Sequence, residues 1–127
     1  MEKIHLEQAK IWFEHARGIL KEESGISYAV GVAMTIHAII KANDALIFKF
    51  LNVLPKKHDD AKRLFKDLVD EKKVDPKYAN YADIVQEAIT LKARAEYSGK
   101  YFSKKDLENI TKKAERFIKM VSETLGD

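Results

Sequence analysis

Apolar side chains recur every three or four residues along almost the whole chain, the spacing that places them on one face of an α-helix. No stretch alternates between apolar and polar residues as a half-buried strand would. The periodicity predicts helices over residues 2–23, 27–51, 57–72, 77–98 and 103–125. We therefore predict an all-α fold, an antiparallel up-and-down bundle of about five helices.

Breaking residues divide these segments and keep the connections short. Gly25 is predicted to end the first helix, and Gly99 the fourth. Pro55 and Pro76 interrupt the chain on either side of the third helix. Ser103 opens a capping-box pattern before the fifth helix. At 127 residues, the chain is expected to form a single domain over residues 1–127.

The second helix is apolar almost all round, Val30 included, which predicts the buried centre of the bundle. His37, Lys41 and Asp44 interrupt it at intervals of four and three residues, so they form a polar stripe. A buried polar stripe is costly unless its groups find partners. The stripe therefore either lines a cleft or faces water or another subunit.

Composition limits the location and the chemistry of the protein. The chain has no Cys, which excludes disulfides, thiolate zinc sites and cysteine nucleophiles and fits a reducing compartment. Its first residues are amphipathic, unlike the apolar core of a signal peptide. The most apolar run, residues 28–40, looks too short to cross a bilayer. A cytoplasmic protein without membrane contact is expected.

Positive charge is concentrated near the C-terminal end. Residues 92–119 hold nine Lys or Arg and four Asp or Glu, a net charge of +5, which leaves −2 for the rest of a chain whose total is +3. This asymmetry is compatible with a polyanionic partner. A solvated, Lys-rich helix face is the simpler explanation and is favoured over such a partner.

The end of the fourth predicted helix carries a candidate ligand-binding site. Arg94, Tyr97 and Tyr101 are spaced by three and four residues, so they share one face if the helix persists. A guanidinium beside two phenols can hold a phosphate and stack on a base. The alternative is that the tyrosines are core residues and Arg94 counters the helix dipole.

Other sites of known chemistry are not indicated. The sequence has no glycine-rich phosphate loop, paired-histidine zinc helix or nucleophile elbow. Side chains of His58, Asp59 and Asp60 diverge around a helix, which favours capping over a metal site. No metal and no cofactor is expected. Trp12 is predicted to be a core residue or to border a subunit interface.

Four segments, in this order, resemble the HEPN family of small prokaryotic helical domains, in particular its stand-alone branch. They are the small-residue-rich second helix from Tyr28 to Ala42, the basic entry to the third helix from Lys56 to Phe65, the run from Leu91 to Tyr97, and the closing stretch from Ala114 to Ile118. Each motif is degenerate alone, and the resemblance rests on their order and spacing across most of the chain.

The resemblance implies a helical bundle that forms a homodimer, often beside a small nucleotidyltransferase partner. Many members cut RNA without a metal, using an Arg followed after four to six residues by a His, sometimes with a Tyr two positions later. Arg94 matches that arginine and Tyr101 the tyrosine, but Gly99 stands where the histidine should be. No His follows His58.

Loss of this histidine matters, because a group that moves protons near neutral pH typically contributes about 10²–10⁴-fold to such a reaction. Three functions therefore stay open. The first is a module that binds RNA or a nucleotide and associates with a nucleotidyltransferase. Its expected ligand-binding residues are Arg94, Tyr97 and Tyr101, with Lys41 and Asp44 as further candidates. The second is a metal-independent ribonuclease toxin with its base relocated to His37 or His58. The third is a structural protein-interaction bundle.

Overall fold

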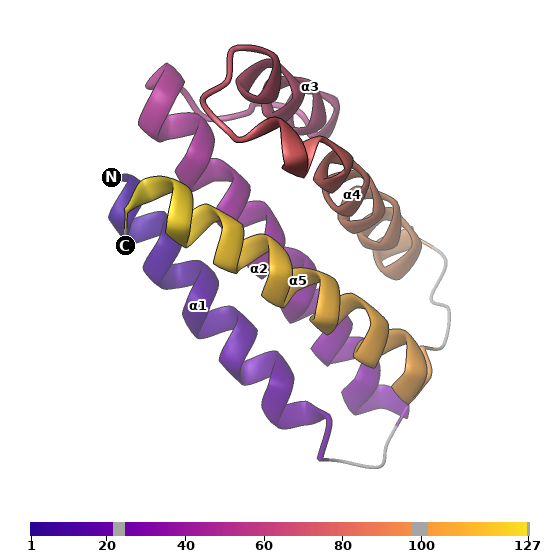
Figure 1. Ribbon diagram of the computed structural model, residues 1–127. Helices are drawn as coiled ribbons and strands as arrows, with labels where there is room; N and C mark the ends of the chain where they lie inside the picture. The colour runs from indigo at the N-terminus through magenta and orange to yellow at the C-terminus, as the bar shows by residue number, and fades with distance from the viewer. Residues whose placement is uncertain (22–24, 98–101, 127) are drawn as a thin grey trace.

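The computed structural model describes residues 1–21, 25–97 and 102–126. Helices account for most of these ranges, and no strand occurs within them, so the predicted all-α fold is confirmed. In chain order the elements are α1 (Glu2–Ile19), α2 (Gly25–Leu51), α3 (His58–Asp70), the short 3₁₀ helix η1 (Pro76–Tyr81), α4 (Ala82–Tyr97) and α5 (Lys104–Leu125) (Figure 1).

Helix α2 is the centre of the bundle and packs against each of the other four α-helices. The long helices α1, α2, α4 and α5 alternate in direction, and α3 covers the end of the molecule where α2 finishes and α4 begins (Figure 1). Small residues allow this crowding, since Ala38, Ala42 and Ala45 of α2 are fully buried. Close packing also requires Gly31, where an added Cβ would lie 2.8 Å from Leu107 Cδ2.

One residue of α2 departs from the predicted burial. Val30 was expected in the core with the rest of the helix, but it is 45% exposed. It precedes the exposed His37 by seven residues, two turns of helix, and therefore lies on the same outward stripe. Because α2 is apolar on all sides, its sequence did not show which side the other helices cover and which side is exposed to solvent.

The first connection also differs from the sequence prediction. Helix α1 ends at Ile19, where the N–H of Leu20 bonds to the carbonyl of Arg17. Gly25 is the first residue of α2, so it does not cap α1 as predicted. Residues 22–24, between the two helices, lie outside the described ranges.

Two helix starts follow from local side-chain chemistry. At the start of η1, Asp75 Oδ1 accepts the N–H of Lys77 at 3.0 Å, and Pro76 is the first residue of the helix. The segment that begins here is a 3₁₀ helix, whereas the sequence predicted an α-helix. The predicted capping box before α5 is confirmed. Ser103 Oγ accepts the N–H of Asp106 at 3.1 Å, and Asp106 Oδ2 accepts the N–H of Ser103 at 2.9 Å.

Helix α2 is longer than the apolar run that the sequence singled out. Over Tyr28–Leu51 it is long and apolar enough to cross a membrane, judged by length and composition alone. This corrects the expectation that the segment is too short. However, 61% of its most apolar window is buried inside the bundle, as in the core helix of a soluble protein.

Candidate functional site

Arg94 lies in the last turn of α4 and is held against an aromatic ring. Its Cζ atom stands 4.8 Å from the centroid of Phe102, whose side chain is 1% exposed. Phe102 comes just before the Ser103 cap of α5, so the contact joins the end of α4 to the start of α5. A guanidinium over a ring face is attracted by the ring quadrupole. Arg94 is therefore half-buried and oriented by the fold.

A pocket of about 130 Å³ adjoins this contact, lined by residues of α2, α4 and α5 together with Phe102. These residues are Val32, Glu87, Leu91, Arg94, Phe102, Asp106 and Asn109. The two acids in the lining have partners of their own. Glu87 forms an ion pair with Lys113 of α5, and Asp106 accepts the N–H of Ser103. The pocket thus presents a cation, an amide and two carboxylates.

The predicted triplet of Arg94, Tyr97 and Tyr101 is only partly described. Tyr97 is the last residue of α4, but its side chain lies outside the described part of the chain. Tyr101 and Gly99 lie outside it entirely. That the three side chains share one face therefore stays a prediction.

The polar stripe of α2 is on a different side of that helix. Val32 lines the Arg94 pocket, and His37 is five residues further on, about 140° around the helix. His37 is exposed and meets Trp12 of α1 edge-on, with ring centroids 4.8 Å apart. The Arg94 pocket and the stripe that holds His37 therefore lie on different sides of α2.

Burial shifts the pKa of both Asp44 and His37, and neighbouring charge opposes that shift at Asp44 but adds to it at His37. Burial raises the pKa of Asp44 to about 6, although the neighbouring Lys41 favours the ionised carboxylate. The pKa of His37 is lowered by burial and by the positive charges of Lys41 and Lys92. A neutral imidazole and an easily protonated carboxylate therefore lie two turns apart on α2.

His58 lies far from the Arg94 pocket along the bundle. It begins α3, at the end of the molecule where α4 starts (Figure 1). Arg94 is twelve residues past the first residue of α4, a rise of about 18 Å. The side chain of His58 is outside the described part of the chain.

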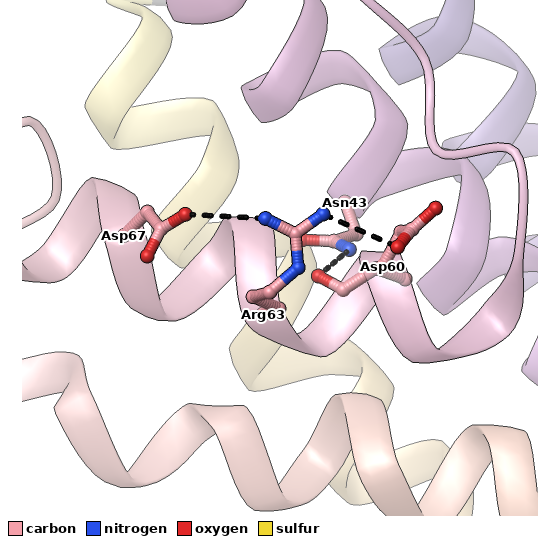
Figure 2. Close-up of polar contacts among 5 residues, drawn as sticks. Asn43, Asp60, Arg63 and Asp67 are labelled. Atoms are coloured by element: carbon pink, nitrogen blue, oxygen red, sulfur yellow. Dashed lines mark hydrogen bonds and ion pairs between the residues drawn. The ribbon is translucent and has the colours of Figure 1, made fainter.

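In the same turn of α3, Asp60 forms an ion pair with Arg63 at 3.2 Å (Figure 2).

Sequence reasoning missed His5 as a notable residue. Its side chain is 8% exposed, and neither ring nitrogen has a hydrogen-bond partner among the residues that the structure describes. Burial lowers its pKa, and Lys41 and the amino terminus lower it further. The sequence signal that could have found His5 is its position on the apolar stripe of α1, one turn before the buried Ala9.

Trp12, predicted as core or as an interface border, is 38% exposed and so is not a core residue.

The basic C-terminal segment forms the outer side of α5. Lys105, Lys112, Arg116 and Lys119 are all exposed, and their spacing of three to seven residues keeps them on one side of the helix. Glu115 and Glu123 are exposed on the same helix and reduce its net charge. This cationic side begins one turn from Asn109, which lines the Arg94 pocket.

Comparison with known proteins identifies the family. No curated protein matches the sequence. The family model of the HEPN domain matches residues 3–124, which is nearly the full chain and covers all the helices described above except for the first residue of α1 and the last of α5. The Arg94 pocket, the polar stripe of α2 and the cationic side of α5 all fall within this match, and the chain belongs to the HEPN domain family.

Proposed function

We propose that this HEPN domain binds RNA or a nucleotide at the pocket around Arg94. The observation that carries the proposal is the placement of Arg94 itself. A half-buried guanidinium, oriented over the ring of Phe102 at the edge of a small pocket, can receive a phosphate with little loss of side-chain entropy.

The surroundings of the pocket suit a nucleotide better than a simple anion. Glu87, Asp106 and Asn109 offer oxygen and amide groups to the edge of a base, while Arg94 supplies the positive charge. Lys105, one turn from Asn109, begins the cationic side of α5 along which a longer backbone would continue. Tyr97 and Tyr101 remain the proposed stacking residues of this site.

The proposed module binds its ligand and does not cut it by the family's usual route. Gly99 replaces the histidine that the family pattern requires, and the sequence has no His after His58. His37 contacts Trp12 on another side of α2 from the Arg94 pocket, which argues against His37 as the relocated base within one chain. Without a group that transfers protons near neutral pH, cleavage should be slower by about 10²–10⁴-fold. A nucleotidyltransferase is the protein partner that we propose from the family resemblance.

A gel-shift experiment with total RNA in EDTA separates binding from cleavage. Wild type and Arg94→Ala are compared, with the fold of each checked by circular dichroism. The proposal expects intact RNA that is retarded by wild type and released by the variant. Fragments that disappear with the variant would instead show a ribonuclease. Free, intact RNA in every lane would contradict the proposal and favour a protein-interaction bundle.

A further inference from the structure

A pocket of about 240 Å³ lies between α1 and α5. The two helices run antiparallel, since the start of α1 and the end of α5 lie at the same end of the bundle (Figure 1). Each of them packs more extensively against α2 than against the other, which leaves the space between them partly open. A cavity of roughly 150 Å³ can hold a molecule the size of benzene, so this pocket has room for a small organic ligand.

Apolar side chains form the floor of this pocket, and charged side chains form its rim. Phe13, which is 7% exposed, and the half-buried Leu20 line it from α1. Two cations and two carboxylates surround this floor: Arg17, Lys112, Glu108 and Glu115. Because these charges cancel, the pocket favours neither a simple anion nor a simple cation, but suits a ligand that carries both signs.

The charged residues follow a definite order along the pocket. Phe13 and Glu115 lie close across the two helices, because both also line the adjoining pocket between α1 and α5. Four residues further along α1 is Arg17, and a similar step back along the antiparallel α5 reaches Lys112. A step of seven residues back along α5 reaches Glu108. Two cations therefore occupy opposite rims at the middle, with one carboxylate towards each end.

The charged side chains of α5 in this pocket are not used by the fold. Glu108, Lys112 and Glu115 are spaced by four and three residues, and ion pairs do form at these spacings on α1 and α3. None of the three has an ion pair within the described ranges. Arg17 has one partner, since its Nη1 lies 3.4 Å from Glu14 Oε1. Most of the five N–H donors of its guanidinium remain available for a ligand.

We propose that this pocket binds a free α-amino acid with an apolar side chain. Its carboxylate lies at the middle, between Arg17 and Lys112, where two like charges repel each other unless an anion separates them. The planar guanidinium can hold a carboxylate through two parallel hydrogen bonds. Arg17 is oriented for this contact, because its Cζ stands 5.7 Å from the centroid of the Phe13 ring.

The two other groups of an α-amino acid match the two ends of the pocket. The ammonium and the side chain leave the α-carbon in different directions. At one end the ammonium reaches Glu108, which is half-buried, so that the ion pair is less screened by water than an exposed one. At the other end the side chain covers the ring of Phe13. A ligand that lacks any of the three groups leaves one part of the pocket without a partner.

This site does not depend on the proposed RNA site. The pocket shares no lining residue with the pocket around Arg94. Lys112 also belongs to the cationic side of α5, so a substitution there would change both sites. Substitution of Arg17 and Glu108 tests amino-acid binding alone, and failure of one proposal leaves the other standing.

An NMR titration of the ¹⁵N-labelled protein with L-leucine tests the proposal. Amide shifts should saturate with a dissociation constant of about 1 mM or lower, and should be concentrated around residues 13–20 and 108–115. Glycine, which has no side chain to cover Phe13, should bind at least ~10-fold more weakly. Shifts that do not saturate, or that lie elsewhere in the bundle, would overturn the proposal.

Matched ligands and variants identify which charge binds which group. Leucinamide lacks the carboxylate and 4-methylpentanoate lacks the ammonium, so wild type should bind each at least ~10-fold more weakly than leucine. Arg17→Gln should abolish the preference for leucine over leucinamide, and Glu108→Gln the preference for leucine over 4-methylpentanoate.

Arg63→Gln is the control for these variants, since Arg63 is also an exposed arginine paired within its own helix, to Asp60. It should keep both preferences of wild type, and circular dichroism confirms that each variant folds. Equal binding of leucine and leucinamide by wild type, or preferences that survive in Arg17→Gln and Glu108→Gln, would overturn the proposal.

Discussion

Trp12 of α1 meets His37 of α2 edge-on, with ring centroids 4.8 Å apart and ring planes at 77°. The indole thus covers one side of an imidazole that belongs to the polar stripe of α2. This contact links the exposed apolar side chains of α1 to the titratable side chains of α2.

The first prediction concerns the pKa of His37. Burial, Lys41 and Lys92 lower it from its ordinary value of 6.5, so protonation of His37 below that value opposes folding and stability falls as the pH is lowered. Trp12→Ala should expose the imidazole and move the His37 pKa back towards 6.5, measured by NMR titration of the ring protons. An equal His37 pKa in wild type and Trp12→Ala would contradict this account.

The second prediction concerns Asp44. Its pKa is raised to about 6 from 3.8, so the folded chain keeps a proton that the unfolded chain releases between these values. Stability should therefore fall as the pH rises through this window and remain lower above it. Asp44→Asn should stabilise at pH 7 by about 1 kcal/mol, after allowance for solvent exposure, and by little near pH 4. Urea unfolding at the two pH values measures the difference, and equal effects at both would refute the shift.

The third prediction compares two glycines in helices. A Cβ at Gly31 would lie 2.8 Å from Leu107 Cδ2 and 3.2 Å from Ile19 Cγ2, whereas one at Gly18 meets nothing within 4 Å. Gly31→Ala should lower the free energy of unfolding by about 1–3 kcal/mol through overpacking. Gly18→Ala should raise it by roughly 0.5–1 kcal/mol through helix propensity. Chemical denaturation measures both, and a stabilising Gly31→Ala would show that α1, α2 and α5 pack less closely than described.

The fourth prediction concerns Asn43, which ties α2 to the start of α3. Its side chain is 1% exposed, and Nδ2 donates to the carbonyl of Ala61 at 3.2 Å (Figure 2). Asn43→Ala should cost about 1–3 kcal/mol of stability and speed amide exchange in α3. Asn43→Asp should cost more at pH 7, because the carboxylate would be buried without a donor, and less at acidic pH, where it is protonated.

Asn80→Ala, in η1, is the control for this pair of variants, since Asn80 is exposed and its loss should change stability by less than ~0.5 kcal/mol. Asn43→Ala with the stability of wild type would show that the hydrogen bond to α3 contributes nothing.

Features set by neighbouring residues could be predicted from the sequence. The capping box at Ser103 requires only residues three apart, and the central position of α2 follows from its apolar composition. Features set by packing could not. Nothing in the sequence indicates that Arg94 stacks on Phe102, because that contact depends on how the chain returns after α4. The exposure of Val30 was missed for the same reason, since the other helices decide which side of α2 they cover.

The candidate site was predicted in part. Its spacing to Tyr97 and Tyr101 and the family pattern predict Arg94, and the structure adds the pocket beside it. Glu87 and Asn109 of the same pocket were not predicted, because they come from separate helices and no motif joins them. His37 was proposed as a relocated base, and only the three-dimensional structure shows it on another side of α2.

The central claim is that Arg94 contacts a phosphate of a bound RNA. The most direct test is the salt dependence of binding to a fluorescent single-stranded RNA, measured by anisotropy for wild type, Arg94→Gln and Arg63→Gln. Arg63 is a matched control, since it is exposed on α3 and paired with Asp60 and Asp67 (Figure 2). Arg94→Gln should bind at least ~10-fold more weakly at matched salt and reduce the slope of log K against log salt by about 0.7, while Arg63→Gln matches wild type. Equal affinities and slopes for all three proteins would contradict the claim.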